Sequence, residues 1–172
     1  MVLNTDNVFE QTVESAADEY FIQEAEQALR PRLVVKLVDE TVTSSTIMQD
    51  DDELFMSLSA NCTYEFELNV LLAHQSGGVN HDLTIVGPTG SIGRFYLTAT
   101  GGDISTEFIP TNLAIEIRDV FGAATTGSYS QIKGWIKVAN ISGNLQFKWA
   151  QYSSSVYWNK VLAGSWMKVT RQ

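Results

Sequence analysis

Two hydrophobic periods divide the chain near Pro31. Residues 7–30 contain no glycine or proline, and their apolar side chains recur at steps of three and four, which predicts an amphipathic helix. Asn7 and Glu10 have capping-box spacing at its start, and Pro31 favours its end. Because a narrow apolar stripe among acids would fray alone, we expect residues 1–32 to attach to a partner or to further copies. The predicted contact face consists of Phe9, Val13, Ala17, Tyr20 and Phe21.

After Pro31 the period changes to two, which is typical of half-buried strands. The clearest case is 64–72, where Tyr64, Phe66 and Leu68 alternate with polar residues. Glycine and proline clusters separate the predicted strands, which are 33–38, 54–60, 64–72, 82–86, 93–98, 113–121, 131–139, 145–152 and 164–170. Eight to ten short strands predict a mainly β domain over 33–172, an antiparallel sandwich or jelly roll. The stretch 133–151 predicts a hairpin that turns at 142–144.

Composition supports one acidic globular unit. The 172 residues are 44% hydrophobic and 18% charged, with a net charge of −9, which argues against nucleic acid or an anionic membrane as a partner. All but two of the 20 acids precede residue 111, whereas seven of the 11 bases follow residue 110. Two interpretations remain open: the two halves pack against each other between subunits, or the fold mixes them and cancels the asymmetry.

The chain carries no sequence sign of export or membrane insertion. No stretch approaches the ~20 apolar residues that span a bilayer. Residues 1–6 lack the basic and apolar regions of a signal peptide, so we expect no secretory signal and synthesis in a cytoplasm. The single cysteine, Cys62, permits no intrachain disulfide and no cysteine-built zinc site, and we expect a small, half-buried side chain there.

Candidate chemistry is sparse. His74 and His81 flank a Gly-containing loop, and we expect solvent-exposed loop histidines; a shared metal is the alternative, but no third ligand is evident. The acidic run 50–53 predicts a solvated loop, because it lacks the alternating ligands and glycine of a calcium loop. Glu65 and Glu67 share one side of a strand and are expected on its wet face. We therefore expect no enzymatic activity, catalytic residue, metal or cofactor.

Aromatic residues are concentrated near the C-terminal end. All four tryptophans lie between residues 135 and 166. Phe147 and Trp149 have the same parity on one strand, which favours the core or an oligomer interface over sugar stacking. Tyr157 and Trp158 lie in a predicted loop and are the better candidates for a surface contact.

Two runs at this end resemble a known family. Residues 145–155 (LQFKWAQYSSS) and 161–169 (VLAGSWMKV) are similar to the C-terminal domain of many bacteriophage minor structural proteins, with its "QWAQ" strand, Ser/Thr-rich loop and "VLAGSYLKV"-like strand. Residues 63–66 and 84–90 resemble its early strand and Gly-Pro turn. The resemblance covers 33–172 and implies a trimeric jelly roll of the tumour-necrosis-factor type on a virion surface, in head decoration, head fibres or tail fibres, without enzymatic activity.

The chain departs from that pattern in its acidic N-terminal helix and in the bulky residues 157–160. We therefore predict a homotrimeric capsid decoration, or cement, protein on the outer head surface, anchored by residues 1–32 to the major capsid protein or another virion protein. The alternative is a tail-fibre or receptor-binding tip that recognises host glycans through Tyr157 and Trp158. A small carbohydrate-active enzyme is a third class, and no motif supports it.

Overall fold

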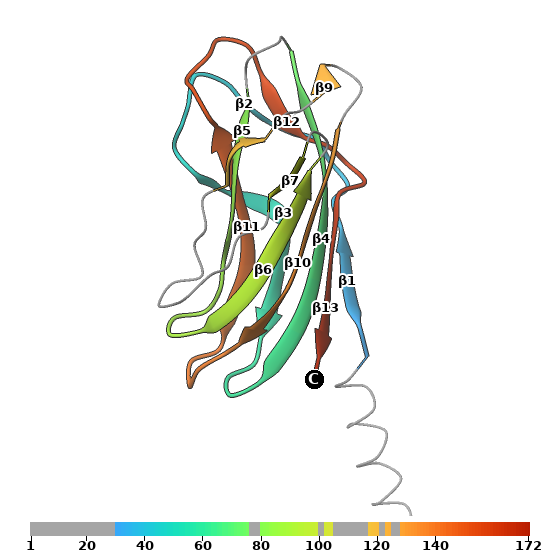
Figure 1. Cartoon of the computed structure of the whole chain (residues 1–172), viewed down its shortest axis with the longest axis vertical. Coiled ribbons are helices and arrows are strands. Elements are labelled where there is room, and N and C mark those ends of the chain that lie inside the picture. Colours follow the sequence, from blue (N-terminus) through green and yellow to red (C-terminus); the bar gives the residue numbers. More distant parts are fainter. Residues whose placement is uncertain (1–29, 76–79, 100–101, 105–116, 121–122, 125–127) are drawn as a thin grey trace, which may run out of the picture.

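The structure is a computed structural model. It describes residues 30–75, 80–99, 102–104, 117–120, 123–124 and 128–172. These residues are mainly β and contain thirteen strands (Figure 1): β1 (Arg32–Val35), β2 (Glu40–Val42), β3 (Gln49–Leu58), β4 (Thr63–His74), β5 (His81–Val86), β6 (Ile92–Ala99), β7 (Gly102–Ile104), β8 (Ile117–Val120), β9 (Ala123–Ala124), β10 (Ser128–Lys137), β11 (Gly143–Gln151), β12 (Asn159–Val161) and β13 (Trp166–Arg171). The prediction of 8–10 strands missed the short β2, β7, β9 and β12. The predicted helix and its face, Phe9, Val13, Ala17, Tyr20 and Phe21, lie outside the described residues.

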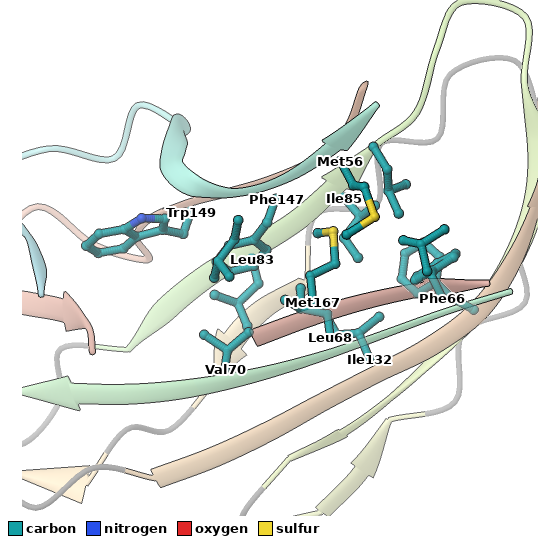
Figure 2. Packing of buried hydrophobic residues seen from close by; sticks show 14 of the residues in the cluster. Met56, Phe66, Leu68, Val70, Leu83, Ile85, Ile132, Phe147, Trp149 and Met167 are labelled. Atoms are coloured by element: carbon teal, nitrogen blue, oxygen red, sulfur yellow. The ribbon is translucent and has the colours of Figure 1, made fainter. Parts of the chain in front are cut away.

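The strands form two sheets. A nine-stranded sheet has the order β1-β13-β4-β10-β6-β7, with β2, β9 and β12 joined beside it, and a four-stranded sheet has the order β3-β11-β5-β8. The core lies between them, as Figure 2 shows: Leu68 and Met167 of the larger sheet point toward Leu83 and Phe147 of the smaller one, and all four are fully buried. Alternation in β4 explains this burial, since every second residue from Tyr64 to Leu72 enters the core.

The main strand pairs are nested around the middle of the chain. β1 pairs with β13, β3 with β11, β4 with β10 and β5 with β8, and each pair is antiparallel. The short pair of β2 with β12 fits into the same series. Strands of the first half of the described chain therefore pair with strands of the second half in reverse order. Most strands that follow each other in the sequence lie in opposite sheets.

Nested pairing overturns the predicted hairpin over 133–151. β10 pairs with β4 and β6 in the larger sheet, whereas β11 pairs with β3 and β5 in the smaller one. The glycine-containing turn at 142–144 therefore connects two sheets rather than two paired strands. Sequence pattern alone does not distinguish these cases, because both need a turn between amphipathic strands.

The acidic run was also predicted wrongly. Residues 50–53 belong to β3, and Asp51 is buried, whereas Asp50 and Asp52 point outward.

The turn at 87–90, which its glycines and Pro88 predict, is present and joins β5 to β6. The backbone N–H of Ser91 donates to the Pro88 carbonyl at 3.0 Å, and Gly90 has a φ of 78°.

Candidate functional site

A groove on the outward side of the nine-stranded sheet is the first candidate site. It crosses β4, β6, β10 and β13 and has a volume of about 360 Å³. Its lining is Glu65, Phe66, Glu67, Tyr96, Lys133, Gly134, Trp135, Lys168 and Thr170, which we call the outer-face groove. Strand register places Leu33, Lys168, Glu67, Lys133 and Tyr96 in one row across five strands.

Glu67 is the polar centre of this groove. Its carboxylate lies 3.1 Å from Lys133 Nζ and 3.5 Å from Lys168 Nζ, and Gln131 Nε2 donates to it at 2.8 Å. Burial by itself raises the pKa of Glu67, but hydrogen bonds from Lys133 and Asn69 and the charges of both lysines hold that pKa below its ordinary value. The carboxylate is therefore ionised at neutral pH and fixed between two cations.

Gly134 lines the groove and lies where β6 and β10 are in close contact. A Cβ on Gly134 would lie 2.2 Å from the carbonyl oxygen of Arg94 and 2.5 Å from Phe95 Cβ on β6, so any side chain there would push β6 and β10 apart. Gly134 pairs with Phe66 and Phe95, whose side chains are buried, so this Cβ would point toward the core and only the Gly134 backbone borders the groove. The groove walls include Tyr96 and Trp135, which are 50% and 39% exposed. The groove thus combines two aromatic walls with a fixed charge triad.

Further exposed apolar side chains extend the same face. Strand alternation places them on the outward side with Glu67, and the set is Leu33, Val35, Ile92, Tyr96, Tyr129 and Trp135. We call this set the outer sheet face. Apolar surface gathered on one sheet face, rather than scattered singly, is typical of a surface that contacts another macromolecule.

The predicted contact residues Tyr157 and Trp158 lie in the loop between β11 and β12. Tyr157 is 45% exposed, whereas Trp158 is half-buried and Lys160 Nζ lies 5.1 Å from the centre of its ring. The loop is held by Gln151, whose fully buried side chain donates to the Tyr157 carbonyl at 2.7 Å. The structure thus places both residues in one loop, and Tyr157 alone presents much of its surface to solvent.

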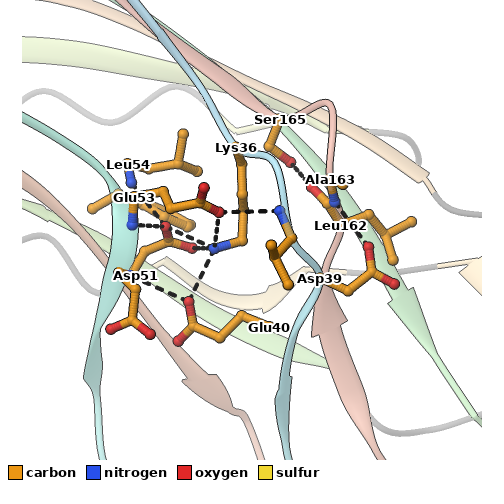
Figure 3. A network of polar contacts seen from close by, with 12 residues as sticks. Lys36, Asp39, Glu40, Asp51, Glu53, Leu54, Leu162, Ala163 and Ser165 are labelled. Carbon is orange, nitrogen blue, oxygen red and sulfur yellow. Dashed lines mark hydrogen bonds and ion pairs between the residues drawn. The ribbon is translucent and has the colours of Figure 1, made fainter.

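Lys36 forms a buried ion-pair cluster that sequence reasoning missed (Figure 3). Its Nζ lies 3.0 Å from Asp51, 3.1 Å from Glu40 and 3.6 Å from Glu53. Burial by itself lowers the pKa of Lys36, but the hydrogen bonds and negative charges of Asp51 and Glu40 raise it above the ordinary value. The cluster joins the end of β1 to β2 and β3. Two features of the sequence could have indicated it: Lys36 interrupts the apolar run 33–38, and residues 50–53 are all acidic.

The histidines are not exposed loop residues, contrary to prediction. His74 ends β4 and His81 begins β5, and their exposed fractions are 6% and 0%. The His81 ring lies 6.2 Å from the ring of Trp149 in the core. No cluster of three or more His, Cys, Asp or Glu within the described residues is arranged to hold a metal ion.

Three other predictions are confirmed. Phe147 and Trp149 are fully buried in the core, Glu65 and Glu67 point to the outward side of β4, and Cys62 is half-buried. Within the described residues, the fold brings charges of the two halves together. The ion pairs Lys133–Glu67, Lys148–Asp50, Lys160–Asp39 and Lys168–Glu67 each join a base of the second half to an acid of the first.

Comparisons with known proteins add no assignment. No family model matches the chain, and no curated protein matches it. Among solved structures, the subviral particle of infectious bursal disease virus VP2 is 13% identical with a TM-score of 0.25, and the Gt strain of that virus is 7% identical with a TM-score of 0.27. Each alignment covers 83% of this chain, which spans only 37% and 38% of those chains. Similarities of this size establish neither a shared fold nor a shared function.

The described part of the chain contains no helix that is both long and apolar enough to cross a bilayer.

Proposed function

We propose that this chain is a bacteriophage virion protein, a jelly roll that assembles as a homotrimer and decorates and stabilises the outer surface of the head. The nested strand pairs support the jelly-roll part of the proposal. A jelly roll is an eight-stranded double sheet, equivalent to a long hairpin folded over itself. The four pairs β1–β13, β3–β11, β4–β10 and β5–β8 have this arrangement, two in each sheet.

The outer sheet face is the observation that carries the assembly part of the proposal. It combines apolar side chains such as Leu33 and Trp135 with the compensated charges around Glu67. Glu67 is already paired with Lys133 and Lys168 inside one chain, so a second copy that covers this face does not leave the carboxylate without a partner. Closed cyclic symmetry would let each copy use the same surfaces.

Attachment to the head is assigned to residues 1–32, through the predicted face Phe9, Val13, Ala17, Tyr20 and Phe21. The start of β1 and the C-terminus both lie at the lower end of the domain in Figure 1, so a segment bound there leaves the opposite end directed outward. The proposed partner is the major capsid protein or another virion protein. A trimer bound across capsid subunits stabilises the shell by mass action, since it binds the assembled form only. The proposal includes no catalysis and no cofactor.

Light scattering on the full-length protein tests the assembly. The expected mass is that of a trimer, and Trp135→Glu is expected to lower it, since the new charge would be buried in the interface. Ile47→Glu, at an exposed loop position away from the outer sheet face, is the matched control and keeps the trimer. A monomeric wild-type protein at micromolar concentration would remove self-assembly from the proposal.

A second candidate function is recognition of host glycans, as in a tail fibre or receptor-binding tip. The exposed ring of Tyr157 favours it, because that ring lies in the loop between β11 and β12, at the end of the domain opposite the start of β1 (Figure 1). The two candidates are compatible in one protein, since they use different surfaces.

A further inference from the structure

Two described loop segments at the end opposite the start of β1 are uncharged. Segments 43–48 and 152–159 contain no Asp, Glu, Lys or Arg. They expose Ile47, Tyr152, Val156 and Tyr157, and we call these four residues the distal loop surface. Figure 1 shows this end at the top, remote from the C-terminus.

One buried glutamine holds the two segments together. Gln151 Oε1 accepts from the backbone N–H groups of Ser45 and Ser155, each at 3.1 Å. Its Nε2 donates to the carbonyl of Tyr157 at 2.7 Å. Since the Gln151 side chain is fully buried, these bonds are shielded from competition with water.

Backbone contacts reinforce this arrangement. The N–H of Ser44 donates to the carbonyl of Ser155 at 2.7 Å, and the N–H of Gln75 donates to the carbonyl of Trp158 at 2.9 Å. Asn159 Nδ2 donates to the carbonyl of Asn80 at 2.9 Å. The loops are therefore fixed before any ligand arrives, and a fixed surface loses less conformational entropy on binding.

The composition of these loops favours an uncharged ligand with hydroxyl groups. Residues 152–159 read Tyr-Ser-Ser-Ser-Val-Tyr-Trp-Asn, a composition typical of recognition loops, where tyrosine gives rigid contact area and serine adaptable hydrogen bonds. Lys160, which follows this loop in β12, is engaged: its Nζ lies 3.5 Å from Asp39 and 5.1 Å from the centre of the Trp158 ring. Residues 152–159 themselves carry no charged side chain that would pair with an ionic ligand.

We propose that the distal loop surface binds a neutral saccharide, whose ring C–H groups pack on Tyr152 and Tyr157 while its hydroxyls bond to loop serines and backbone groups. This inference rests on the second candidate function and names its ligand class. An aliphatic protein surface is the competing occupant, because Ile47 and Val156 are 79% and 80% exposed. The uncharged, hydroxyl-rich loop favours the saccharide.

A glycan array with the full-length protein tests the proposal. The array carries neutral oligosaccharides of glucose, galactose, mannose and N-acetylhexosamines beside sialylated and sulfated ones, and titration calorimetry gives the Kd of the best neutral ligand. Binding to neutral glycans is expected, with about a tenfold weaker Kd in Tyr157→Ala and in Tyr152→Ala, equivalent to about 1.4 kcal/mol. Phe55→Ala removes an exposed aromatic ring from β3 of the smaller sheet, outside both proposed contact surfaces, and is expected to leave Kd unchanged.

Three outcomes would overturn the saccharide site: binding only to charged glycans, binding that the two tyrosine variants leave intact, or no glycan binding by a folded protein at millimolar ligand. Light scattering on the same samples separates this failure from failure of assembly. A trimer without saccharide binding contradicts only the distal site, and a monomer that binds saccharide contradicts only the trimer.

Discussion

The ammonium group of Lys36 lies 3.0 Å from each carboxylate oxygen of Asp51, and neither side chain has more than 1% of its surface exposed. Asp51 also accepts the backbone N–H groups of Glu53 and Leu54, at 3.0 and 2.8 Å. This pair joins the first strand of the domain to β3 in the opposite sheet. Its burial makes it a far stronger determinant of stability than the exposed ion pairs.

Replacing Lys36 tests this directly. Lys36→Met keeps the aliphatic stem but leaves Asp51 as an uncompensated buried charge, and we expect a loss of about 3–5 kcal/mol in the free energy of unfolding. Urea unfolding measures the loss. Lys160→Met breaks a partly exposed pair with Asp39 and should cost no more than about 1 kcal/mol. Equal losses in the two variants would contradict the role of burial.

Acid should destabilise the domain partly through Glu67. The folded-state pKa of Glu67 is lowered, so its stabilising contribution is complete above the unfolded value of about 4.3 and is lost as the pH falls from there through the folded pKa. We expect Glu67→Gln to reduce the drop in urea midpoint between pH 7 and pH 3. Glu65→Gln, which removes an exposed carboxylate of the same strand, is the matched control. A pH dependence equal to wild type in Glu67→Gln would refute the assignment.

Gly134 should be intolerant of any side chain. In Gly134→Ala the new Cβ meets backbone atoms of Arg94 and Phe95, which cannot move without parting β6 from β10, and we expect a loss of about 1–3 kcal/mol. Gly143→Ala places its Cβ 3.3 Å from Pro88 Cβ and should cost less. Thermal unfolding followed by circular dichroism compares the two. A Gly134→Ala protein as stable as wild type would show that the strands separate easily.

Two tryptophans should differ sharply in their contribution to folding. Trp149 is fully buried beside His81, and we expect Trp149→Ala to cost about 3–5 kcal/mol. Trp135→Ala removes a partly exposed ring, so its effect on unfolding of the isolated chain should stay within about 1 kcal/mol. Urea unfolding monitored by far-ultraviolet circular dichroism avoids the fluorescence of the altered residues. A costly Trp135→Ala in a monomeric sample would mean that the outer sheet face stabilises the domain itself.

Strand positions could be predicted from sequence wherever one face is buried and one is wet. β4 is the best example, because its alternation from Tyr64 to Leu72 reports the core directly. β5 is different: its burial is nearly continuous, so His81 is buried at a position where polarity suggested a loop, and Asp82 is buried at the start of the predicted strand. The short β2 and β12 hold only three residues each, too few for a period to be visible.

The candidate sites were less predictable, because they depend on which strands become neighbours. Glu67 meets Lys133 and Lys168 only after β4 lies between β10 and β13, and no spacing along the chain encodes that contact. Lys36 and Asp51 are likewise brought together from opposite sheets. Tyr157 was the exception, since turn-rich sequence on both sides already indicated a loop.

Nested pairing also sets the order of events during synthesis. β1 is completed by β13, the last strand of the chain, so the edge it forms cannot close until Arg171 has left the ribosome. The four-stranded sheet that covers the inward side chains of β4 is likewise incomplete until β11, residues 143–151, has been made. Folding of such long-range pairs is slow because loop closure precedes the stabilising contacts. A stalled or truncated chain would therefore expose the apolar side chains of its core strands and be prone to aggregation.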